Sequence, residues 1–291
     1  MKVLITGARG FIGSALVGKL INDGHHVFAC IGSSNSPISF KANKGNLNIL
    51  YGNLLSDIKM PSTIDAVVHA AAQSPTMDTS ATSMLHNNIY LTDKLISYAK
   101  IAGAKRFIYL SSISVYGEIK AKTVLETTPI INPDFYGTTK RIGEQLLEAE
   151  ASSFSSVSIR LPGVIGPKSV RNWMTHVMHA ARNGDMVLVY NPYEDFNNAA
   201  HVEDVGDFVS SLISTEWHGS EVVNIGALGK IPVLEAMQII VNGFGGRSEI
   251  IFEPSTKSSF TISSEKAVNE FRYKPMRIDA MLRRFVKENI I

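Results

Sequence analysis

Three tyrosines in the sequence are each followed, four positions later, by a lysine. The pairs are Tyr90 with Lys94, Tyr116 with Lys120, and Tyr136 with Lys140. Two side chains at this spacing on a helix lie on the same face. The ammonium of such a lysine stabilises tyrosinate and lowers the pKa of the phenol from its reference of about 10. The phenol can then exchange a proton with a substrate hydroxyl or carbonyl near neutral pH.

The place of each pair along the chain separates the candidates. Tyr136 opens an expected helix at 136–151, 24 residues after the end of an apolar strand that closes with Ser111 and Ser112. Catalytic groups of an open parallel sheet gather at the carboxyl ends of its strands. We therefore predict that Tyr136 and Lys140 are the catalytic pair. Either of the other pairs, or a purely structural role, is the alternative.

Gly7, Gly10 and Gly13 lie between the first expected strand and the first expected helix. A tight turn and a close approach of the backbone to a pyrophosphate both require residues without a Cβ atom. The N-terminus of the next helix, with Phe11 and Ile12 in its first turn, offers free N–H groups and a positive dipole end. The segment is therefore predicted to bind a dinucleotide, with a structural turn as the alternative.

The second expected strand ends in the run 29–34, which contains no acidic residue. NAD sites usually place an Asp or Glu there to bind the ribose hydroxyls. Arg9 in the glycine loop, with Ser33 or Ser34, can instead bind a 2′-phosphate, although Arg9 can equally be a solvated loop residue. The sequence therefore favours NADP, with NAD as the alternative.

Composition narrows the class of protein. The chain has 291 residues, 45% of them hydrophobic and 19% charged, with a net charge of +2. These values are typical of a globular protein and give no reason to expect nucleic acid or a membrane as a partner. The one cysteine, Cys30, excludes a disulfide framework, and the eight histidines show no metal-site spacing. Without a recognisable signal peptide or membrane span, we expect a cytoplasmic protein.

Apolar runs alternate with helical patterns through the first half of the chain. We expect strands at 2–6, 27–31, 47–51, 65–69, 106–111 and 157–161, and helices at 11–23, 84–102 and 136–151. This alternation predicts an α/β fold, a Rossmann-type doubly wound parallel sheet covered by helices. Further helices are expected at 173–183, 204–214 and 233–242. We therefore expect a dinucleotide-binding domain at 1–166 and a small α/β substrate lobe at 167–291, with some strands returning to the sheet.

Together these features resemble the extended short-chain dehydrogenase/reductase family, which contains nucleotide-sugar epimerases, dehydratases and 4-ketoreductases. The matching stretches, in the family's order, are 6–13, 69–72, 87–92, 110–117, 136–140, 160–167, 201–205, 224–226 and 264–275. The resemblance implies that Tyr136 is the general acid/base and that Lys140 holds the nicotinamide ribose. It also implies that Ser112 binds the substrate oxygen. Ser111 is the rival of Ser112, which can alternatively be a capping hydroxyl at a strand end.

The resemblance implies the remaining site residues as well. The positions for the cofactor wall are Asn53, Leu54, Ala70, Ala71, Ala72, Asn87 and Pro162. The positions for the substrate are Ser74, Ser112, Ser114, Gly163, Arg171 and Asn172. Relatives that use nucleotide sugars commonly have Asn near Gly163 and Arg near Asn197, so both positions depart from the pattern. Arg171 and Asn172 are candidates to replace those contacts.

We predict an oxidoreductase that reduces a keto group on a sugar, which is nucleotide-linked. A nucleotide-sugar epimerase with tightly bound NAD is the alternative, and a non-catalytic dinucleotide sensor is the second. A dehydratase fits less well, because Ile113 and Ser114 stand where the family's dehydratases have acidic residues. The resemblance also implies a homodimer, formed through the helices at 84–102 and 136–151.

Overall fold

The computed structural model describes residues 1–32, 45–56, 58–255 and 259–290. The chain divides into two compact units. Unit 1 comprises residues 1–117, 130–160 and 205–223, and unit 2 comprises 118–129, 161–204 and 224–291. Both units are built from separate segments of the chain, so they are not divided by a single break after residue 166.

Unit 1 is organised around a seven-stranded sheet with the order β12-β7-β5-β4-β1-β2-β3. The strands are β1 (Lys2–Thr6), β2 (His26–Ile31), β3 (Leu47–Tyr51), β4 (Ala66–His69), β5 (Arg106–Ser112), β7 (Ser155–Leu161) and β12 (Ser220–Asn224). β1 pairs in parallel with β2 on one side and with β4 on the other. The strand order therefore reverses between β1 and β4, and ligands of doubly wound sheets bind at such a switch point. The predicted Rossmann-type fold is confirmed.

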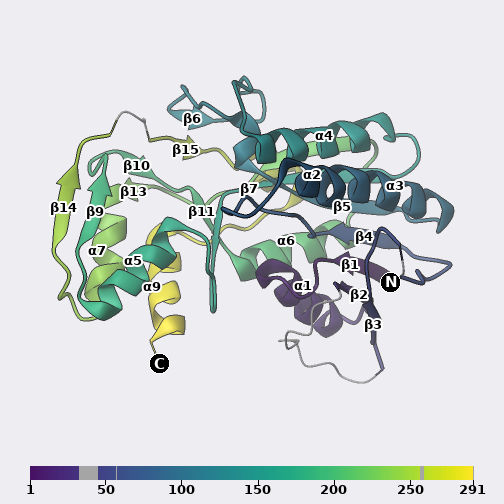
Figure 1. Cartoon of the computed structure of the whole chain (residues 1–291), viewed down its shortest axis with the longest axis horizontal. Helices are drawn as coiled ribbons and strands as arrows, with labels where there is room; N and C mark the ends of the chain where they lie inside the picture. The colour runs from purple at the N-terminus through teal and green to yellow at the C-terminus, as the bar shows by residue number, and fades with distance from the viewer. Residues whose placement is uncertain (33–44, 57, 256–258, 291) are drawn as a thin grey trace. The chain divides into compact units, whose positions relative to one another are not determined.

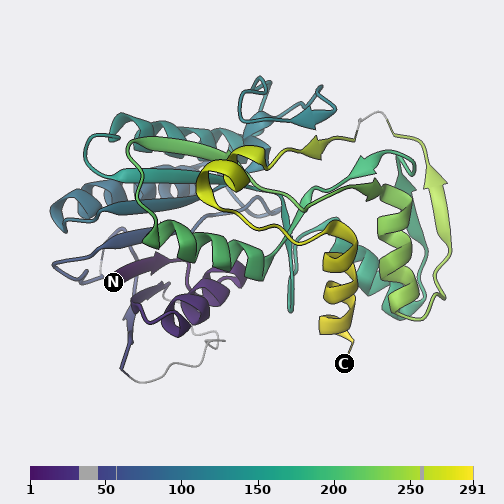
Figure 2. The same cartoon turned by 180° about the vertical axis from the view of Figure 1, so that it is seen from behind.

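Helices cover both faces of this sheet. α3 (Leu91–Ile101) and α4 (Phe135–Ala149) lie on one side, and α1 (Phe11–Asn22) and α6 (Val202–Ser214) lie on the other (Figure 1). The view from behind shows the same two layers (Figure 2). Side chains such as Leu4, Val67 and Phe107 point from the strands into these layers and are fully buried. The strands whose carboxyl ends carry the predicted site are therefore anchored in a packed core.

The prediction of a single helix at 84–102 is wrong in one respect. A short α2 (Ala81–Met84) leads into a π-helical segment, η1 (Leu85–Tyr90), before α3 begins. A π-helical turn contains one residue more than an α-helical turn and is frequent at functional sites. The extra residue changes the phase of the helix, and in this segment Asn88 is the buried residue.

Unit 2 combines short strand pairs with three packed helices. The pairs are β8 (Gly163–Ile165) with β11 (Ala199–His201), β9 (Val187–Tyr190) with β14 (Ile250–Glu253), β10 (Asp195–Phe196) with β13 (Ile231–Pro232), and β6 (Thr123–Val124) with β15 (Thr261–Ile262). α5 (Trp173–Asn183), α7 (Val233–Gly243) and α9 (Ile278–Asn289) enclose an apolar core, and α8 (Glu265–Phe271) precedes α9. In the described part of the chain, no helix has the length and apolar character needed to cross a membrane.

Candidate functional site

The glycine loop between β1 and α1 is shaped to approach a ligand closely. Gly7 has φ +67°, and a Cβ atom on it would lie 2.7 Å from the Ala71 nitrogen. A Cβ on Gly13 would lie 2.1 Å from the Gly7 carbonyl oxygen, so neither position accepts a side chain. Gly10 is the N-cap of α1, whose first turn carries no acidic residue. The loop and helix N-terminus therefore fit the pyrophosphate of a dinucleotide.

His69, at the end of β4, joins this loop to the helices above the sheet. Its Nδ1 lies 2.7 Å from the Thr6 hydroxyl, and its Nε2 lies 3.0 Å from the Thr92 hydroxyl. The Thr92 hydroxyl donates its proton to the Asn88 carbonyl, so Nε2 of His69 must be the protonated nitrogen. Burial lowers the pKa of His69 to about 3, and the charge of Lys140 acts in the same direction. The ring is therefore a neutral structural link that donates a hydrogen bond to Thr92, and it does not act as a general acid.

The serines at the end of β5 have different surroundings. Ser111 is buried and donates a hydrogen bond to Glu144 Oε1 at 2.7 Å. Ser112 is partly exposed and is the N-cap of the 3₁₀ turn η2 (Ile113–Tyr116). Its Oγ accepts from the Ser114 nitrogen and donates to the Ser114 hydroxyl, both at 3.1 Å. The structure thus leaves Ser112 and Ser114, and not Ser111, as the hydroxyls available to a ligand, while Ser112 also caps the turn.

α4 begins directly against this turn. Asp134 caps the helix by accepting from the Gly137 nitrogen at 2.6 Å. A Cβ on Gly137 would lie 2.1 Å from the Ser114 carbonyl oxygen, so only glycine allows this close contact. Tyr136, the residue before Gly137, is held partly exposed at the start of the helix, next to the η2 turn.

Lys140 lies one turn further along α4 and is almost fully buried. Its Nζ donates to the Leu110 carbonyl at 2.7 Å and lies 5.9 Å from the centre of the Tyr136 ring. Burial lowers the pKa of Lys140 to about 7, while the charge of Glu144 acts to raise it. The two members of the predicted catalytic pair are thus close enough to interact, and the lysine exchanges its proton near neutral pH. The rival Tyr90 is exposed, and Tyr116 is fully buried.

Sequence reasoning missed Asn88. This side chain is buried, accepts from the Gln73 nitrogen at 2.7 Å, and donates to Thr139 Oγ1 at 3.0 Å. It thereby links the segment after β4 to α4. The neighbouring Asn87, predicted for the cofactor wall, donates to the Ser83 carbonyl within its own helix. The spacing of Asn88, Leu91 and Thr92 along one buried face is the signal that would have found it.

The other predicted cofactor positions are spread around the same strand ends. Arg9 Nη1 donates to the Gly32 carbonyl at 3.4 Å, directly after β2. Asn53 accepts from the Leu55 nitrogen at 2.9 Å in a local turn, next to the partly buried Leu54. Ala70, Ala71, Ala72 and Ser74 follow β4. Ser33 and Ser34 lie outside the described residues.

The predicted Asn172 and the departing position Asn197, both in unit 2, have structural roles. Asn172 caps α5 by accepting from the Thr175 nitrogen at 2.9 Å, and its amide donates to the Val164 carbonyl. Asn197 is buried and pairs through its amide with the backbone of Ile262, at 2.8 and 2.9 Å. Arg171 is exposed, and Pro162 and Gly163 lie at the start of β8.

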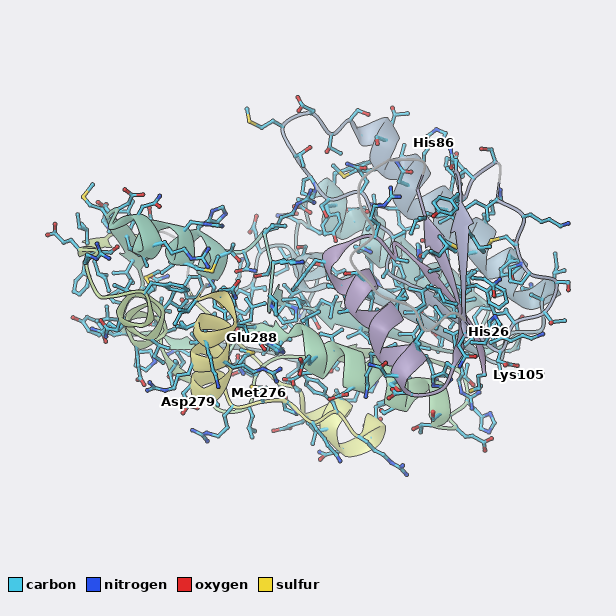
Figure 3. The ribbon with its side chains drawn as sticks, turned by 90° about the horizontal axis from the view of Figure 1, so that it is seen from below. His26, His86, Lys105, Met276, Asp279 and Glu288 are labelled. Atoms are coloured by element: carbon cyan, nitrogen blue, oxygen red, sulfur yellow. The ribbon has the colours of Figure 1, made fainter. Side chains whose placement is uncertain are left out.

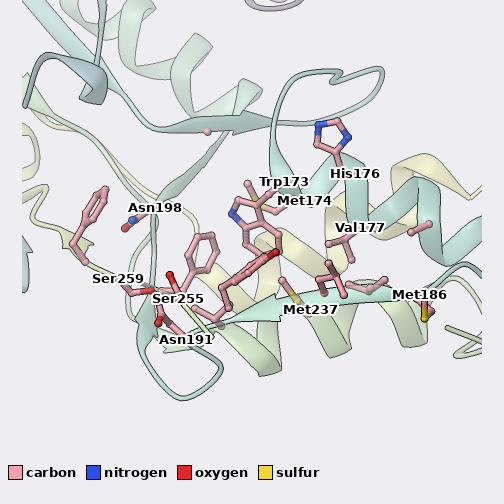
Figure 4. Close-up of a pocket in the computed structure, with 18 residues that line it drawn as sticks. Trp173, Met174, His176, Val177, Met186, Asn191, Asn198, Met237, Ser255 and Ser259 are labelled. Atoms are coloured by element: carbon pink, nitrogen blue, oxygen red, sulfur yellow. The ribbon is translucent and has the colours of Figure 1, made fainter. Parts of the chain in front are cut away.

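Unit 2 also holds a pocket of about 640 Å³ that Gly163 lines. Its walls are mostly apolar and aromatic, from Trp173, Met174, Val177, Met186, Leu188, Tyr190, Phe196, Val233, Met237 and Phe260. In the view of Figure 4 the polar residues Asn191, Ser255 and Ser259 lie at one end and Met186 at the other. No lysine or arginine is among the described residues that line it. The pocket therefore fits an uncharged ring or apolar group with a few hydrogen-bonding atoms.

The histidines are dispersed over the fold. His26 on β2 and His86 on η1 belong to separate elements of unit 1 (Figure 3). In unit 2, His201 Nε2 lies 3.0 Å from Glu288 Oε2 on α9, and Glu288 also accepts from Arg284 Nε at 2.7 Å. Among the described residues, no group of three or more His, Cys, Asp or Glu side chains could hold a metal ion.

Comparisons with known proteins agree with this geometry. A family model described as the NAD dependent epimerase/dehydratase family matches residues 3–226. The curated relatives include an uncharacterized UDP-glucose epimerase, YtcB, from Bacillus subtilis, which is 26% identical over 87% of this chain and 85% of its own. They also include a putative UDP-glucose 4-epimerase from Methanocaldococcus jannaschii, 25% identical over 86% and 85%.

Solved structures show the same fold. MoeE5, in complex with UDP-glucuronic acid and NAD, has a TM-score of 0.82 and is 26% identical, covering 99% of this chain and 98% of MoeE5. The UDP-glucuronic acid 4-epimerase from Bacillus cereus, in complex with NAD, has a TM-score of 0.84 at 22% identity, covering 99% and 96%. At that identity the second likeness concerns the fold alone.

Proposed function

The chain belongs to the NAD dependent epimerase/dehydratase family, within the extended short-chain dehydrogenases/reductases, and we propose that it is a nucleotide-sugar epimerase. It is an enzyme of this family, which needs a nicotinamide dinucleotide. The observation that carries the proposal is the placing of Ser112, Tyr136 and Lys140 around one strand end beside the glycine loop. The relatives named as UDP-glucose epimerases favour this activity over the keto reduction that we expected first.

The proposed chemistry divides between cofactor and protein. A bound nicotinamide ring supplies a hydride acceptor that later returns the hydride. Tyr136 takes the proton of the substrate hydroxyl as the carbon–oxygen bond becomes a carbonyl, and Ser112 donates a hydrogen bond to that oxygen. Lys140, when charged, favours the tyrosinate form. Once the sugar presents its other face, Tyr136 returns the proton to the carbonyl oxygen, and the carbon would be inverted because the hydride comes back to that other face, with no net consumption of cofactor.

The proposed substrate is a UDP-sugar. MoeE5 was solved with UDP-glucuronic acid and with UDP-glucose, and the two curated relatives described above are named for UDP-glucose. The apolar and aromatic pocket of unit 2 is suited to an uncharged ring, and its polar residues supply hydrogen bonds. The homodimer expected from α3 and α4 is a further proposal, tested by light scattering of the purified protein.

The test begins with the purified protein. Denaturation is expected to release NAD, and incubation with UDP-glucose, UDP-glucuronic acid and UDP-N-acetylglucosamine is expected to yield the 4-epimer of at least one, detected by chromatography. Tyr136→Phe should abolish this conversion while retaining the nucleotide. Release of no nucleotide, together with no conversion, contradicts the epimerase. Conversion that survives Tyr136→Phe contradicts the site.

A ketoreductase that uses NADP is the second candidate. Its support is that Gly32 follows β2 without a carboxylate, and that Arg9 reaches the Gly32 carbonyl. An arginine at this position can bind a 2′-phosphate. Oxidation of added NADPH by a 4-keto-6-deoxy nucleotide sugar, with no nucleotide bound to the protein as purified, would favour this candidate over the epimerase.

A further inference from the structure

A buried ion pair lies directly behind the proposed catalytic residues in unit 1. Arg160 on β7 donates to both carboxylate oxygens of Glu144 on α4, at 2.9 and 2.7 Å. The same carboxylate accepts from Ser111 Oγ at 2.7 Å and from Arg141 Nη1 at 3.0 Å. Arg160 Nη1 also donates to the Tyr116 hydroxyl at 2.7 Å. Both members of the pair are almost completely removed from solvent.

The partners of this pair bracket one short segment of chain. Ser111 immediately precedes Ser112, and Tyr116 is the last residue of the η2 turn that contains Ser114. Glu144 thus fixes the segment before the proposed substrate-binding hydroxyls, and Arg160 fixes it after them. Glu144 also belongs to the helix that carries Tyr136, so the same contacts connect that helix to the segment.

A second contact between α4 and β5 lies one residue earlier. Lys140 donates to the Leu110 carbonyl, and Glu144, four residues later on the same helix face, receives the Ser111 hydroxyl. Two adjacent residues of β5 are therefore held by two adjacent turns of α4. Hydrogen bonds are directional, whereas apolar packing tolerates sliding, so these contacts fix the register of helix and strand.

A gain in folding stability does not by itself explain a buried ion pair such as Glu144 with Arg160. The desolvation of two buried charges can exceed their attraction, and well-packed apolar residues of similar volume often serve as well or better. A bidentate guanidinium–carboxylate contact does provide a fixed geometry. We propose that Glu144 and Arg160 are positioning residues that hold the 112–114 segment in place against Tyr136, through Ser111 and Tyr116. The proposal rests on the proposed function in one respect, because it takes from it the roles of Ser112 as donor to the substrate oxygen and of Tyr136 in proton transfer.

Two mild substitutions release the segment at either end. Ser111→Ala removes the bond to Glu144, and Tyr116→Phe removes the hydroxyl that binds Arg160. Each has a matched control in unit 1 that loses a similar bond elsewhere. Tyr98→Phe loses a hydroxyl that donates to the Pro61 carbonyl at 2.8 Å. Ser156→Ala loses a hydroxyl that donates to Ser220 at 2.9 Å.

The first measurements need no substrate. Hydrogen exchange followed by mass spectrometry should show the amides of 112–117 exchanging severalfold faster in both test variants and unchanged in both controls. The tyrosinate absorbance of Tyr136, taken as the difference from the matching Tyr136→Phe protein, should appear at higher pH in the test variants only. With a UDP-sugar that the wild type converts, kcat should fall about tenfold, while KM and the dissociation constant for NAD change less than twofold.

Unchanged exchange at 112–117 in both test variants, or an equal change in the controls, overturns the proposal. A lower melting temperature of the test variants, with no change in exchange, tyrosinate ionisation or kcat, also overturns the proposal. If the wild type converts none of the UDP-sugars, the proposed function fails by itself. The exchange and tyrosinate measurements would still decide whether Glu144 and Arg160 position the segment.

Discussion

Replacing Lys140 with methionine should move the ionisation of Tyr136 by an amount that the structure sets. The lysine Nζ is 5.9 Å from the centre of the Tyr136 ring. At an effective dielectric constant of about 20, a unit charge at about 6 Å contributes about 3 kcal/mol to the stability of the phenolate. Since one pKa unit corresponds to about 1.4 kcal/mol, a charged Lys140 lowers the pKa of Tyr136 by about 2 units. Lys140→Met should therefore raise that pKa by at most this amount, because burial lowers the pKa of Lys140 to about 7 and its charge is lost above that pH.

The assay is a titration of tyrosinate absorbance in the ultraviolet. Lys140→Met is compared with wild type after subtraction of the corresponding Tyr136→Phe protein, which removes the other tyrosines. Burial already raises the pKa of Tyr109, the ring nearest Lys140, above this range. Lys94→Met is the control, because Lys94 has the same spacing from the exposed Tyr90. A Tyr136 midpoint that falls in Lys140→Met refutes the electrostatic argument, whereas one that stays in place shows that Lys140 is already neutral when Tyr136 ionises, as its lowered pKa implies.

The same lysine gives a pH dependence of stability. Burial lowers the pKa of Lys140 to about 7 in the folded chain, from an ordinary value of 10.5. Between these values the unfolded chain binds the extra proton, so rising pH favours the folded state. The free energy of unfolding of wild type, relative to Lys140→Met, should therefore increase as the pH rises from about 7 toward 10.5, measured by urea unfolding. A wild-type advantage that shrinks over this range contradicts the burial argument.

Three further predictions concern the surroundings of the site. Gly13→Ala should weaken NAD binding at least tenfold in calorimetry, because its Cβ would lie 2.1 Å from the Gly7 oxygen, whereas Gly18→Ala meets nothing within 4 Å and should be neutral or slightly stabilising. Asn88→Ala should cost about 1–3 kcal/mol in chemical unfolding, because it leaves the buried partners of Asn88 unsatisfied; a smaller loss would mean that water replaces the amide. The folded pKa of His69, about 3, lies below its ordinary 6.5, so the stability it contributes above 6.5 is lost as the pH falls toward 3. His69→Asn should reduce this loss of unfolding free energy at acid pH, measured by urea unfolding. A loss of the same size in His69→Asn would contradict the attribution of the acid dependence to His69.

Local sequence patterns were enough to predict much of the fold and the glycine loop of the candidate site. β1 and β3 begin and end at the predicted residues. The apolar run of β1 fits a strand buried on both faces, whereas β3 is a partly exposed strand at the edge of the sheet. The glycine spacing located the turn before α1, since only residues without a side chain fit there. These features depend on near neighbours in sequence, which is why the sequence reveals them.

Features that depend on distant contacts were not predicted. The choice between Ser111 and Ser112 is made by Glu144, which lies 33 residues from Ser111. The spacing of Asn88 from Leu91 and Thr92 places it on a buried face, but its role depends on Gln73 and Thr139, which lie 15 and 51 residues away in the sequence. The ion pair of Glu144 with Arg160 joins a helix to a strand, and neither residue is distinctive in its local sequence. Tertiary packing supplied each of these, so a single sequence without contacts could not.

The departures in unit 2 bear on how a substrate is recognised. Asn197 stands where the family resemblance places an arginine for the nucleotide diphosphate, yet both atoms of its amide are engaged with the Ile262 backbone. Its amide nitrogen also donates to the Ala227 carbonyl at 3.3 Å, so both of its N–H donors are used and Asn197 is a structural residue that holds β15. Asn172 is similarly used to cap α5. The exposed Arg171 is thus the remaining candidate of this group for a phosphate contact. If the proposed UDP-sugar is the substrate, the described residues that line the apolar pocket offer it no lysine or arginine, so shape and hydrogen bonding would contribute more, and fixed positive charge less, than the family pattern implies.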